Sequence, residues 1–354
     1  MSEQGCSRRD FLRLGAAAGV GLAATHALAA DAPAAAKPLC FNENMEYRRL
    51  GKTGMMVSAV CMGGHWKRIG SITGSGWDRT GGDLTEFDKN RYEVVSRAMD
   101  VGINYIDACS SGEILTYAKA LKGRREKMHL GFSWYERELR FPEWCNAEKL
   151  VQGFDDGLKQ AGLDYVDVWR VTCQMVPGNK ESDIEAVCDA FDKIHAQGKA
   201  LHLGISSHDR PWLKKIIERF PKIEVILTPF TAASNVKPAD SLFDAVKAQD
   251  VGVFGIKPFS SGSLFVEGAG AGGKISAKDD ELARLALRHI LSTGAVTAPI
   301  PGLISLHQVD NVAQAVKEHR ELDAKETAML NDAAAHMLAE LPSDYHWLRD
   351  HTWV

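Results

Sequence analysis

The chain has 354 residues, of which 25% are charged and 45% hydrophobic, and its formal net charge is −4. This mild acidity, without a basic cluster, argues against nucleic acid or an anionic membrane surface as a partner. The length allows one large domain, because barrel domains of about 250 residues or more are common.

The first residues have the pattern of an export signal. The segment Ser7-Arg8-Arg9-Asp10-Phe11-Leu12 precedes a weakly apolar run over 14–24 and the small-residue pattern Ala27-Leu28-Ala29. This order predicts a twin-arginine signal peptide over 1–29, recognition by the twin-arginine export machinery, and a periplasmic or extracellular location. The run is too short and too rich in Gly and Ala for a stable membrane anchor. A chance Arg-Arg pair before a disordered tail is the alternative.

A linker over 30–45, rich in Ala and Pro, is predicted to lead into one domain over 46–354. Within this domain, stretches with helical spacing, such as Leu150-Val151-Phe154-Leu158, alternate with apolar runs. The strand-like runs are 57–62, 103–107, 128–132, 165–171, 201–206, 225–229, 253–258 and 296–300. Eight such repeats bounded by Gly and Pro predict an α/β fold, a parallel (β/α)8 TIM barrel.

Three additions to the barrel are predicted. A hairpin over 47–57, turning at Lys52-Thr53-Gly54, would close the barrel floor. An extra C-terminal helix over 323–341 is followed by an aromatic tail. The long Gly-rich loop over 63–86 should border the active face, which is built from loops after the strands; a surface excursion is the alternative.

Seven cysteines are present, and the six beyond the predicted signal peptide contain no C-x-x-C pair. Several lie in apolar strand contexts, so buried free thiols are expected. An exported protein could contain a disulfide, but the sequence does not assign one. No metal site is predicted, because a set made of His65, Cys109 and Cys173 has suitable ligand types without the spacing of a zinc motif.

Several segments carry a resemblance to a known family. Gly102-Ile103-Asn104-Tyr105-Ile106-Asp107 has the pattern of a buried strand ending in a carboxylate, and Tyr47-Arg48-Arg49-Leu50-Gly51-Lys52-Thr53-Gly54 precedes it. Together with 118–121, 164–167, 204–207 and 302–311, they give a sequence that resembles the aldo-keto reductases over nearly all of 46–320. The resemblance implies an oxidoreductase that acts on a small-molecule substrate with NAD or NADP.

The family's proton donor is a tyrosine, assisted by an aspartate, a lysine and a histidine. A phenol with a pKa of about 10 needs a nearby cation to release its proton at neutral pH. By resemblance, Asp107 matches the aspartate. The tyrosine position falls on Ser110 or Ser111, the lysine position on Ser133 and the histidine position on Thr172. The resemblance therefore implies altered acid–base residues on a retained barrel.

Cofactor contacts also follow from the resemblance. Ser206 matches a carboxamide contact, Lys257 lies where a pyrophosphate would bind, and Gly302, Gln308 and Asn311 resemble the adenosine end. The usual asparagine after Ser206 is Ser207, and an amide position on the sixth strand falls near Leu227. No Lys or Arg lies between Gly302 and Gln308, so a grip on a 2′-phosphate is not expected and NADP is less favoured than in most of the family.

His65 and Asp107 are the candidate catalytic residues, as a base and the group that orients it. A structural role for Asp107 is the alternative, because a buried carboxylate without the family's lysine needs another partner, such as Lys257 or Arg170. A phenol and an ammonium group converging beside Asp107 from elsewhere in the fold would restore ordinary reductase chemistry.

The sequence predicts an exported oxidoreductase of aldo-keto reductase type, with a cofactor loaded before export. A non-redox binding protein on the same barrel is a second hypothesis, because tryptophans near the mouth suit sugars. They are Trp66, Trp77, Trp134, Trp347 and Trp353. A lyase or isomerase that uses Asp107 and His65 without a cofactor is a third. Fold alone does not choose among them.

Overall fold

The computed structural model describes residues 37–66, 68–76, 79, 83–236, 242–267 and 276–350. Residues Pro38–Val354 form one compact unit, which begins inside the predicted linker. Met45, for example, is 5% exposed, and the Asn42 amide donates to the carbonyl of Asp100. The predicted signal peptide over 1–29 and the side chains of Trp77 and Trp353 lie outside the described residues.

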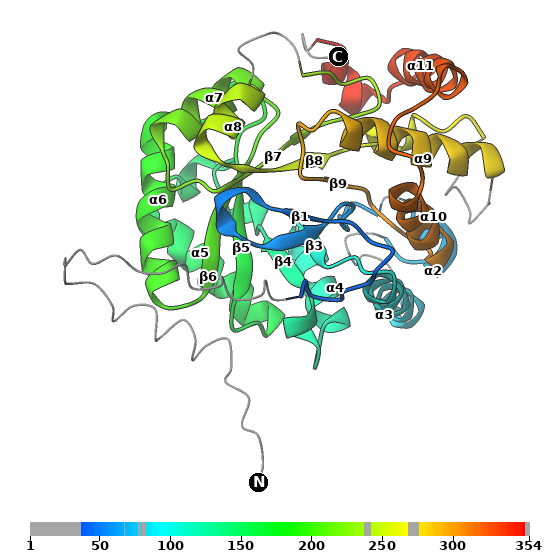
Figure 1. Ribbon diagram of the computed structural model, residues 1–354. Coiled ribbons are helices and arrows are strands. Elements are labelled where there is room, and N and C mark those ends of the chain that lie inside the picture. Colours follow the sequence, from blue (N-terminus) through cyan, green and yellow to red (C-terminus); the bar gives the residue numbers. More distant parts are fainter. Residues whose placement is uncertain are drawn as a thin grey trace, which may run out of the picture. The chain divides into compact units, whose positions relative to one another are not determined.

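Seven parallel strands form one sheet in chain order, which confirms the predicted barrel (Figure 1). They are β3 (Tyr105–Ala108), β4 (His129–Phe132), β5 (Val166–Thr172), β6 (Ala200–Ser206), β7 (Val225–Pro229), β8 (Gly252–Ile256) and β9 (Ala298–Ile300). Two parallel bridges, Met62 to Ile106 and Gly63 to Gly302, close the gap between β3 and β9.

The predicted strand over 57–62 is divided between two structures. Met56–Ser58 forms β2, which pairs antiparallel with β1 (Tyr47–Arg49), and 62–63 supply the bridges that close the barrel. The chain changes direction at Ser58, whose N–H donates to the Asn104 side chain and whose hydroxyl donates to the carbonyl of Val60. The predicted hairpin is confirmed, with the turn η1 (Gly51–Thr53) between its strands.

Helices cover the outside of the strands (Figure 1). They are α2 (Gly70–Thr73), α3 (Thr85–Asp100), α4 (Ser111–Ala120), α5 (Ala147–Ala161), α6 (Glu181–Ala196), α7 (Arg210–Arg219), α8 (Leu242–Gln249), α9 (Ala277–Ser292), α10 (Leu306–Lys317) and α11 (Ala324–Ala339). None of the described helices is long and apolar enough to cross a membrane.

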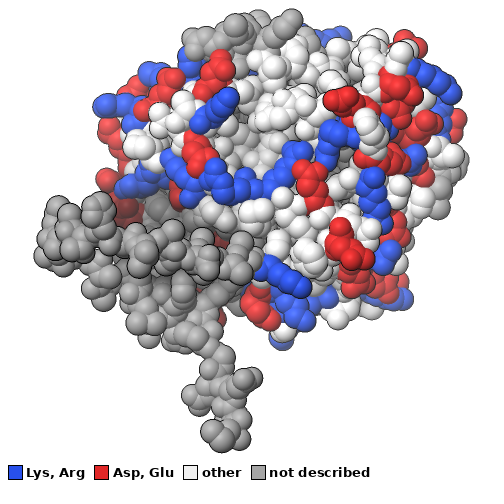
Figure 2. Space-filling model, in the orientation of Figure 1, with Lys and Arg blue, Asp and Glu red and all other residues white. Residues whose placement is uncertain are grey.

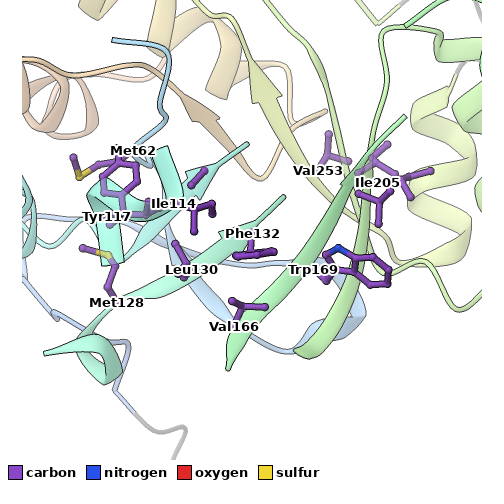
Figure 3. Packing of buried hydrophobic residues seen from close by; sticks show 14 of the residues in the cluster. Met62, Ile114, Tyr117, Met128, Leu130, Phe132, Val166, Trp169, Ile205 and Val253 are labelled. Carbon is purple, nitrogen blue, oxygen red and sulfur yellow. The ribbon is translucent and has the colours of Figure 1, made fainter. Parts of the chain in front are cut away.

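Local sequence explains where these helices begin and end. In α5, the Asn146 side chain accepts from the Lys149 N–H, and Gly162 adopts left-handed geometry after the last turn. Leu150, Phe154 and Leu158 fall on one face and are buried. They join the large cluster between strands and helices, part of which is shown in Figure 3 with Phe132 and Trp169.

The barrel interior is apolar at the floor and polar toward the ends of the strands. Leu50 from the hairpin packs with Tyr105, Val168 and Phe254. Because alternate residues of a strand share a face, Asp107 lies above Tyr105 and Arg170 above Val168. Asp107 and Arg170 therefore lie inside the barrel, nearer to the ends of their strands than this apolar layer.

The predicted C-terminal helix corresponds to α11, which begins with a capping box between Asp323 and Glu326. It is followed by η7 (Ser343–Asp350). Leu348 of η7 packs with Leu282, Leu330 and Met337, so the described part of the tail is anchored on α9 and α11. On the face shown in Figure 2, basic and acidic side chains are interspersed.

Candidate functional site

A cavity of about 200 Å³ lies at the carboxyl ends of the strands. Its walls come from the loop after the barrel-closing bridges, the end of β3, Arg170 of β5, the ends of β8 and β9 with the segments that follow them, α10 and η7. Of the residues predicted from the sequence, His65, Asp107, Lys257, Gly302 and Gln308 line it. This is the end of a (β/α)8 barrel where active sites are built.

Ser206 and Asn311 are not among the described residues that line this cavity. Ser206 is 6% exposed at the end of β6. The Asn311 amide accepts from Arg284 at 2.7 Å and donates to the carbonyl of Asp280 at 3.0 Å, both on α9. Asn311 therefore joins α10 to α9, which is a structural contact.

Three residues other than glycine in the cavity wall have left-handed backbone geometry. The φ angles are 58° at His65, 59° at Lys257 and 60° at Ser261. Such conformations cost free energy for residues with a Cβ, and they concentrate at functional sites. Their shared position supports a binding or catalytic role for this cavity.

Asp107 is paired with Arg170, one of the two partners considered from the sequence. The Arg170 Nε lies 3.1 Å from Asp107 Oδ1, and both side chains are less than 10% exposed. Burial raises the pKa of Asp107 to about 6, although the Arg170 charge opposes the shift. A guanidinium therefore stands beside this carboxylate.

Gly131 makes this pairing possible. It lies on β4, between β3 and β5, and pairs with Asp107 on one side and Val168 on the other. A Cβ at Gly131 would lie 3.1 Å from Asp107 Oδ1 and would collide with the Tyr105 hydroxyl. The missing side chain leaves the space across which Asp107 and Arg170 meet.

Ser133 and Thr172 belong to a buried network around Glu138. Their hydroxyls lie 2.8 Å apart, and the Ser133 hydroxyl donates to Glu138 at 2.5 Å. The carboxylate also accepts from the N–H groups of Thr172 and Trp134 and from the Trp169 indole. Burial raises the pKa of Glu138 to about 7, although these donors oppose the shift. These side chains are not among the described residues that line the cavity.

His65 belongs to a second cluster, with Glu113 and Cys109. Its Nδ1 lies 2.7 Å from Glu113 Oε1 and 3.4 Å from Cys109 Sγ. Glu113 is fully buried and accepts from the backbone N–H groups of His65 and Cys109. Cys109, when ionised, and the Glu113 carboxylate raise the pKa of His65, although burial opposes the shift. The cluster holds the imidazole at the cavity wall.

One end of the cavity fits a phosphate-bearing ligand. The cations Lys257 and Arg68 line it, and Arg68 approaches the backbone at Gly262. Gly302 faces the carbonyl of Gly64, which a Cβ at this glycine would approach to 2.9 Å. The two cations suit the negative charge of a pyrophosphate.

The segment predicted to contact the nicotinamide carboxamide, at the end of β6, is less suited to a dinucleotide. Ser207 is 2% exposed, and its hydroxyl donates to the carbonyl of Gln174 at 2.8 Å. The next residue, His208, is stacked under Trp347 of the tail, with ring centroids 4.3 Å apart. The tail therefore contacts the chain two residues after the end of β6, where the resemblance places a carboxamide contact.

Two phenols are relevant to the acid–base chemistry. Tyr105 lies beside Asp107 but is fully buried and is not among the described residues of the cavity wall. Tyr345, from the tail, lines the cavity, and Lys257 Nζ lies 5.3 Å from its ring centroid. This ammonium contacts the ring face of Tyr345, so its position is that of a cation–π contact.

Comparison with known proteins establishes the family. The chain matches the aldo/keto reductase family over residues 74–335 and belongs to it. The L-galactose dehydrogenase of Arabidopsis thaliana is 25% identical over 301 residues, which cover 78% of this chain and 90% of that protein. The L-glyceraldehyde 3-phosphate reductase of Escherichia coli K12 is 24% identical over 241 residues, which cover 62% and 63% of the two chains.

Solved structures agree on the fold. The holo form of an aldo-keto reductase from Bacillus halodurans matches with a TM-score of 0.58 at 22% identity, covering 82% of this chain and 96% of that one. An aldo/keto reductase from Brucella melitensis matches with a TM-score of 0.55 at 17% identity, covering 82% and 99% of the two chains. The relatives define an oxidoreductase family whose members typically use NAD(P)H.

Sequence reasoning missed two buried carboxylates: Glu113, which contacts His65 in the site, and Glu138, whose network lies outside the described cavity wall. Glu113 is the fourth residue of Ser110-Ser111-Gly112-Glu113, which has the pattern of a capping box. It accepts instead from Cys109, one residue earlier, and from His65. Glu138 follows β4 in a charged segment typical of a solvated loop. The sequence contains no signal for its burial.

Proposed function

We propose that this chain is a nicotinamide-dependent oxidoreductase in which His65 takes the place of the tyrosine proton donor. One observation carries the proposal: a single cavity is lined by Lys257 and Gly302, which suit a dinucleotide, and by His65 and Asp107, which suit a carbonyl compound. Family membership supports the oxidoreductase class. The substituted positions Ser133 and Thr172 support a changed acid–base group, because both hydroxyls bond within the Glu138 network.

When bound, the nicotinamide would supply the hydride that adds to the carbonyl carbon. Lys257 would neutralise phosphate charge at the other end of the ligand. His65 would give a proton to the carbonyl oxygen through Nε2, because its Nδ1 faces Glu113 and Cys109. The products are an alcohol and the oxidised nicotinamide. Arg170 would hold Asp107 ionised at the end of β3.

We also propose export of the folded, loaded protein by the twin-arginine machinery, and NAD in preference to NADP. The order of Arg8-Arg9, the apolar run and the cleavage pattern supports export. The lack of Lys or Arg between Gly302 and Gln308 supports NAD. Replacing Arg8 and Arg9 with Lys should retain the unprocessed chain in the cytoplasm, as an immunoblot of cell fractions would show.

The second candidate is a binding protein without turnover. The observation in its favour is that Ser206 and Ser207 are buried and that Trp347 of the tail stacks on the next residue, His208. If the nicotinamide carboxamide cannot reach β6, the nicotinamide ring would not be held in position for hydride transfer. The cavity would still accept a polar ligand.

The experiment starts from protein purified in its exported form. Mass spectrometry of molecules released on denaturation should find a dinucleotide, and quenching of tryptophan fluorescence should give affinities for NADH and NADPH. His65→Asn, which tolerates left-handed backbone, should lower kcat for aldehyde reduction at least about 100-fold with nucleotide affinity retained. Tyr345→Phe should retain turnover.

Three outcomes would contradict this assignment. A chain that neither contains nor binds a dinucleotide would support the binding protein. Turnover without any nucleotide, lost in Asp107→Asn, would support a lyase or isomerase. Loss of turnover in Tyr345→Phe, with His65→Asn active, would move the proton donor to the tail.

A further inference from the structure

We propose that His65, Cys109 and Glu113 form a binding site for Zn²⁺ at the wall of the cavity. The three residues come from the loop after the barrel-closing bridges, from the end of β3 and from α4. Their ligand atoms, one from each residue, all lie within 4.8 Å of one another. This proposal goes beyond the proposed function and describes a second state of the same residues, because an imidazole whose Nδ1 binds Zn²⁺ is not protonated and cannot act as the proton donor. Its test measures metal binding and needs no turnover.

The orientation of the imidazole favours a metal over a nucleophile triad. In a triad, the base contacts its nucleophile and its orienting carboxylate through opposite ring nitrogens. Here, Nδ1 alone faces both Glu113 Oε1 and Cys109 Sγ, at 2.7 and 3.4 Å. The carboxylate and the sulfur therefore lie on the same side of the imidazole, and the ligand atoms of the three residues are within 4.8 Å of one another, as binding of one shared cation requires.

The carboxylate retains acceptor capacity for this role. Each carboxylate oxygen has two lone pairs. The N–H of His65 donates to Glu113 Oε1 at 2.5 Å, and the N–H of Cys109 donates to Oε2 at 2.8 Å. These contacts fix a fully buried group and leave one lone pair of Oε1 directed at His65 Nδ1.

The surrounding backbone is shaped around this carboxylate. A side chain at Gly64 would collide with the carboxylate of Glu113. At the next residue, the φ angle of 58° turns the His65 ring toward Glu113 and Cys109. A strained residue beside a required glycine indicates that the loop is built to place the imidazole here.

The distances suit zinc after a small adjustment. Bonds of about 2.0 Å to nitrogen and oxygen and 2.3 Å to sulfur put tetrahedral ligand atoms about 3.3–3.6 Å apart. The separation of Nδ1 and Sγ is already 3.4 Å. The separation of Nδ1 and Oε1 would widen from 2.7 Å, and the 45% exposed His65 side chain can move.

The ligand chemistry selects the metal class. One thiolate, one imidazole and one carboxylate are typical zinc ligands, and three protein ligands leave a fourth position for water or substrate. His65 and Cys109 line the cavity, so this position would face it. A cation here would be available to polarise an oxygen atom of a bound ligand.

The test measures zinc binding by the purified mature protein after treatment with a chelator. Titration calorimetry should give one Zn²⁺ per chain, with proton release as Cys109 ionises. Cys109→Ser and His65→Asn should weaken binding at least about 100-fold. Co²⁺ should produce a thiolate-to-cobalt charge-transfer band that is lost in Cys109→Ser.

Matched controls are available. Cys145 is half-buried, and its sulfur donates to the carbonyls of Leu139 and Phe141, so Cys145→Ser should bind Zn²⁺ like the wild type. His336 is exposed on α11, and His336→Asn should do the same. No saturable binding, or equal binding by the folded Cys109→Ser and His65→Asn variants, would overturn the proposal.

Discussion

Around Glu138, polar side chains are buried and hydrogen-bonded to one another. Around His65 and Lys257, polar side chains line a cavity. Both groups lie at the carboxyl ends of the barrel strands. Ser133 and Thr172 belong to the first group, together with five hydrogen bonds that involve the Glu138 carboxylate or join the two hydroxyls. The second group has strained backbone and lines a cavity of about 200 Å³.

The difference teaches that position at a strand end does not make a residue functional. Ser133 and Thr172 stand where the resemblance places a catalytic lysine and histidine, yet they serve packing and hydrogen bonding on one side of the barrel. The chemistry we propose has shifted to the side formed by β3, β8, β9 and the loop containing His65. Asp107 and Arg170 lie between the two groups.

Breaking the central ion pair should have the largest effect. Arg170→Met leaves the Asp107 carboxylate buried without its cation, and we expect the free energy of unfolding to fall by about 3–5 kcal/mol. Urea denaturation would measure it. Arg49→Met, which breaks an exposed pair with Asp250, should leave the midpoint unchanged. Adding Asp107→Asn to Arg170→Met should recover part of the loss, and a double variant as unstable as the sum of both would contradict the pairing.

The buried network should make stability depend on pH. The folded state raises the pKa of Glu138 from 4.5 to about 7, so it binds the proton more tightly than the unfolded chain does. Stability should therefore fall as pH rises between these values, by about 3 kcal/mol from this group. Denaturation at a series of pH values would show the slope.

Glu138→Gln cannot ionise and should flatten this profile. Asp107, with a pKa raised to about 6, contributes a slope of the same sign, so part of the dependence should persist in Glu138→Gln. If the free energy of unfolding depended on pH equally in the wild type and in Glu138→Gln, Glu138 would be ionised over the whole pH range. Its four hydrogen-bond donors favour the ionised form.

A substitution in the cavity wall should change ligand affinity, and the change in free energy should be smaller than in the two preceding predictions. Lys257→Met removes a charge from the proposed phosphate end, and we expect affinity for NADH to fall about tenfold, or about 1.4 kcal/mol. Fluorescence quenching would measure it.

Ser206→Ala provides the comparison on the other side of the barrel, and it should change NADH affinity less than about twofold. If Ser206→Ala lowered NADH affinity more than Lys257→Met does, the dinucleotide would bind against β6, and both sides of the barrel would contribute to the site. Such binding would also require Trp347 to leave His208 when the ligand binds.

Much of the fold could be predicted because its determinants are local. Apolar runs bounded by Gly and Pro gave the strands, and the spacing of Leu150, Phe154 and Leu158 gave a helix. The strand over 57–62 was placed imprecisely, because the hydrogen bonds that divide it depend on Asn104, which is distant in sequence.

The site was less predictable because it depends on contacts between distant segments. Alternation along β5 does place Arg170 on the inner face with Val168, so its pairing with Asp107 could have been preferred. No local pattern brings Glu113 to His65, since 48 residues separate them. The burial of Glu138 depends on donors from β5, including the N–H of Thr172 and the indole of Trp169.

The position of Tyr345 has a consequence for assembly. This residue closes the cavity from the last described segment, whereas His65 contributes from near the start of the compact unit. The cavity wall is therefore complete only when the segment that contains His65 and the tail that contains Tyr345 are both packed on the barrel. A ligand bound in this cavity would contact both segments. Saturation with ligand should therefore slow proteolysis of the tail, even if the free energy of unfolding of the barrel changes little.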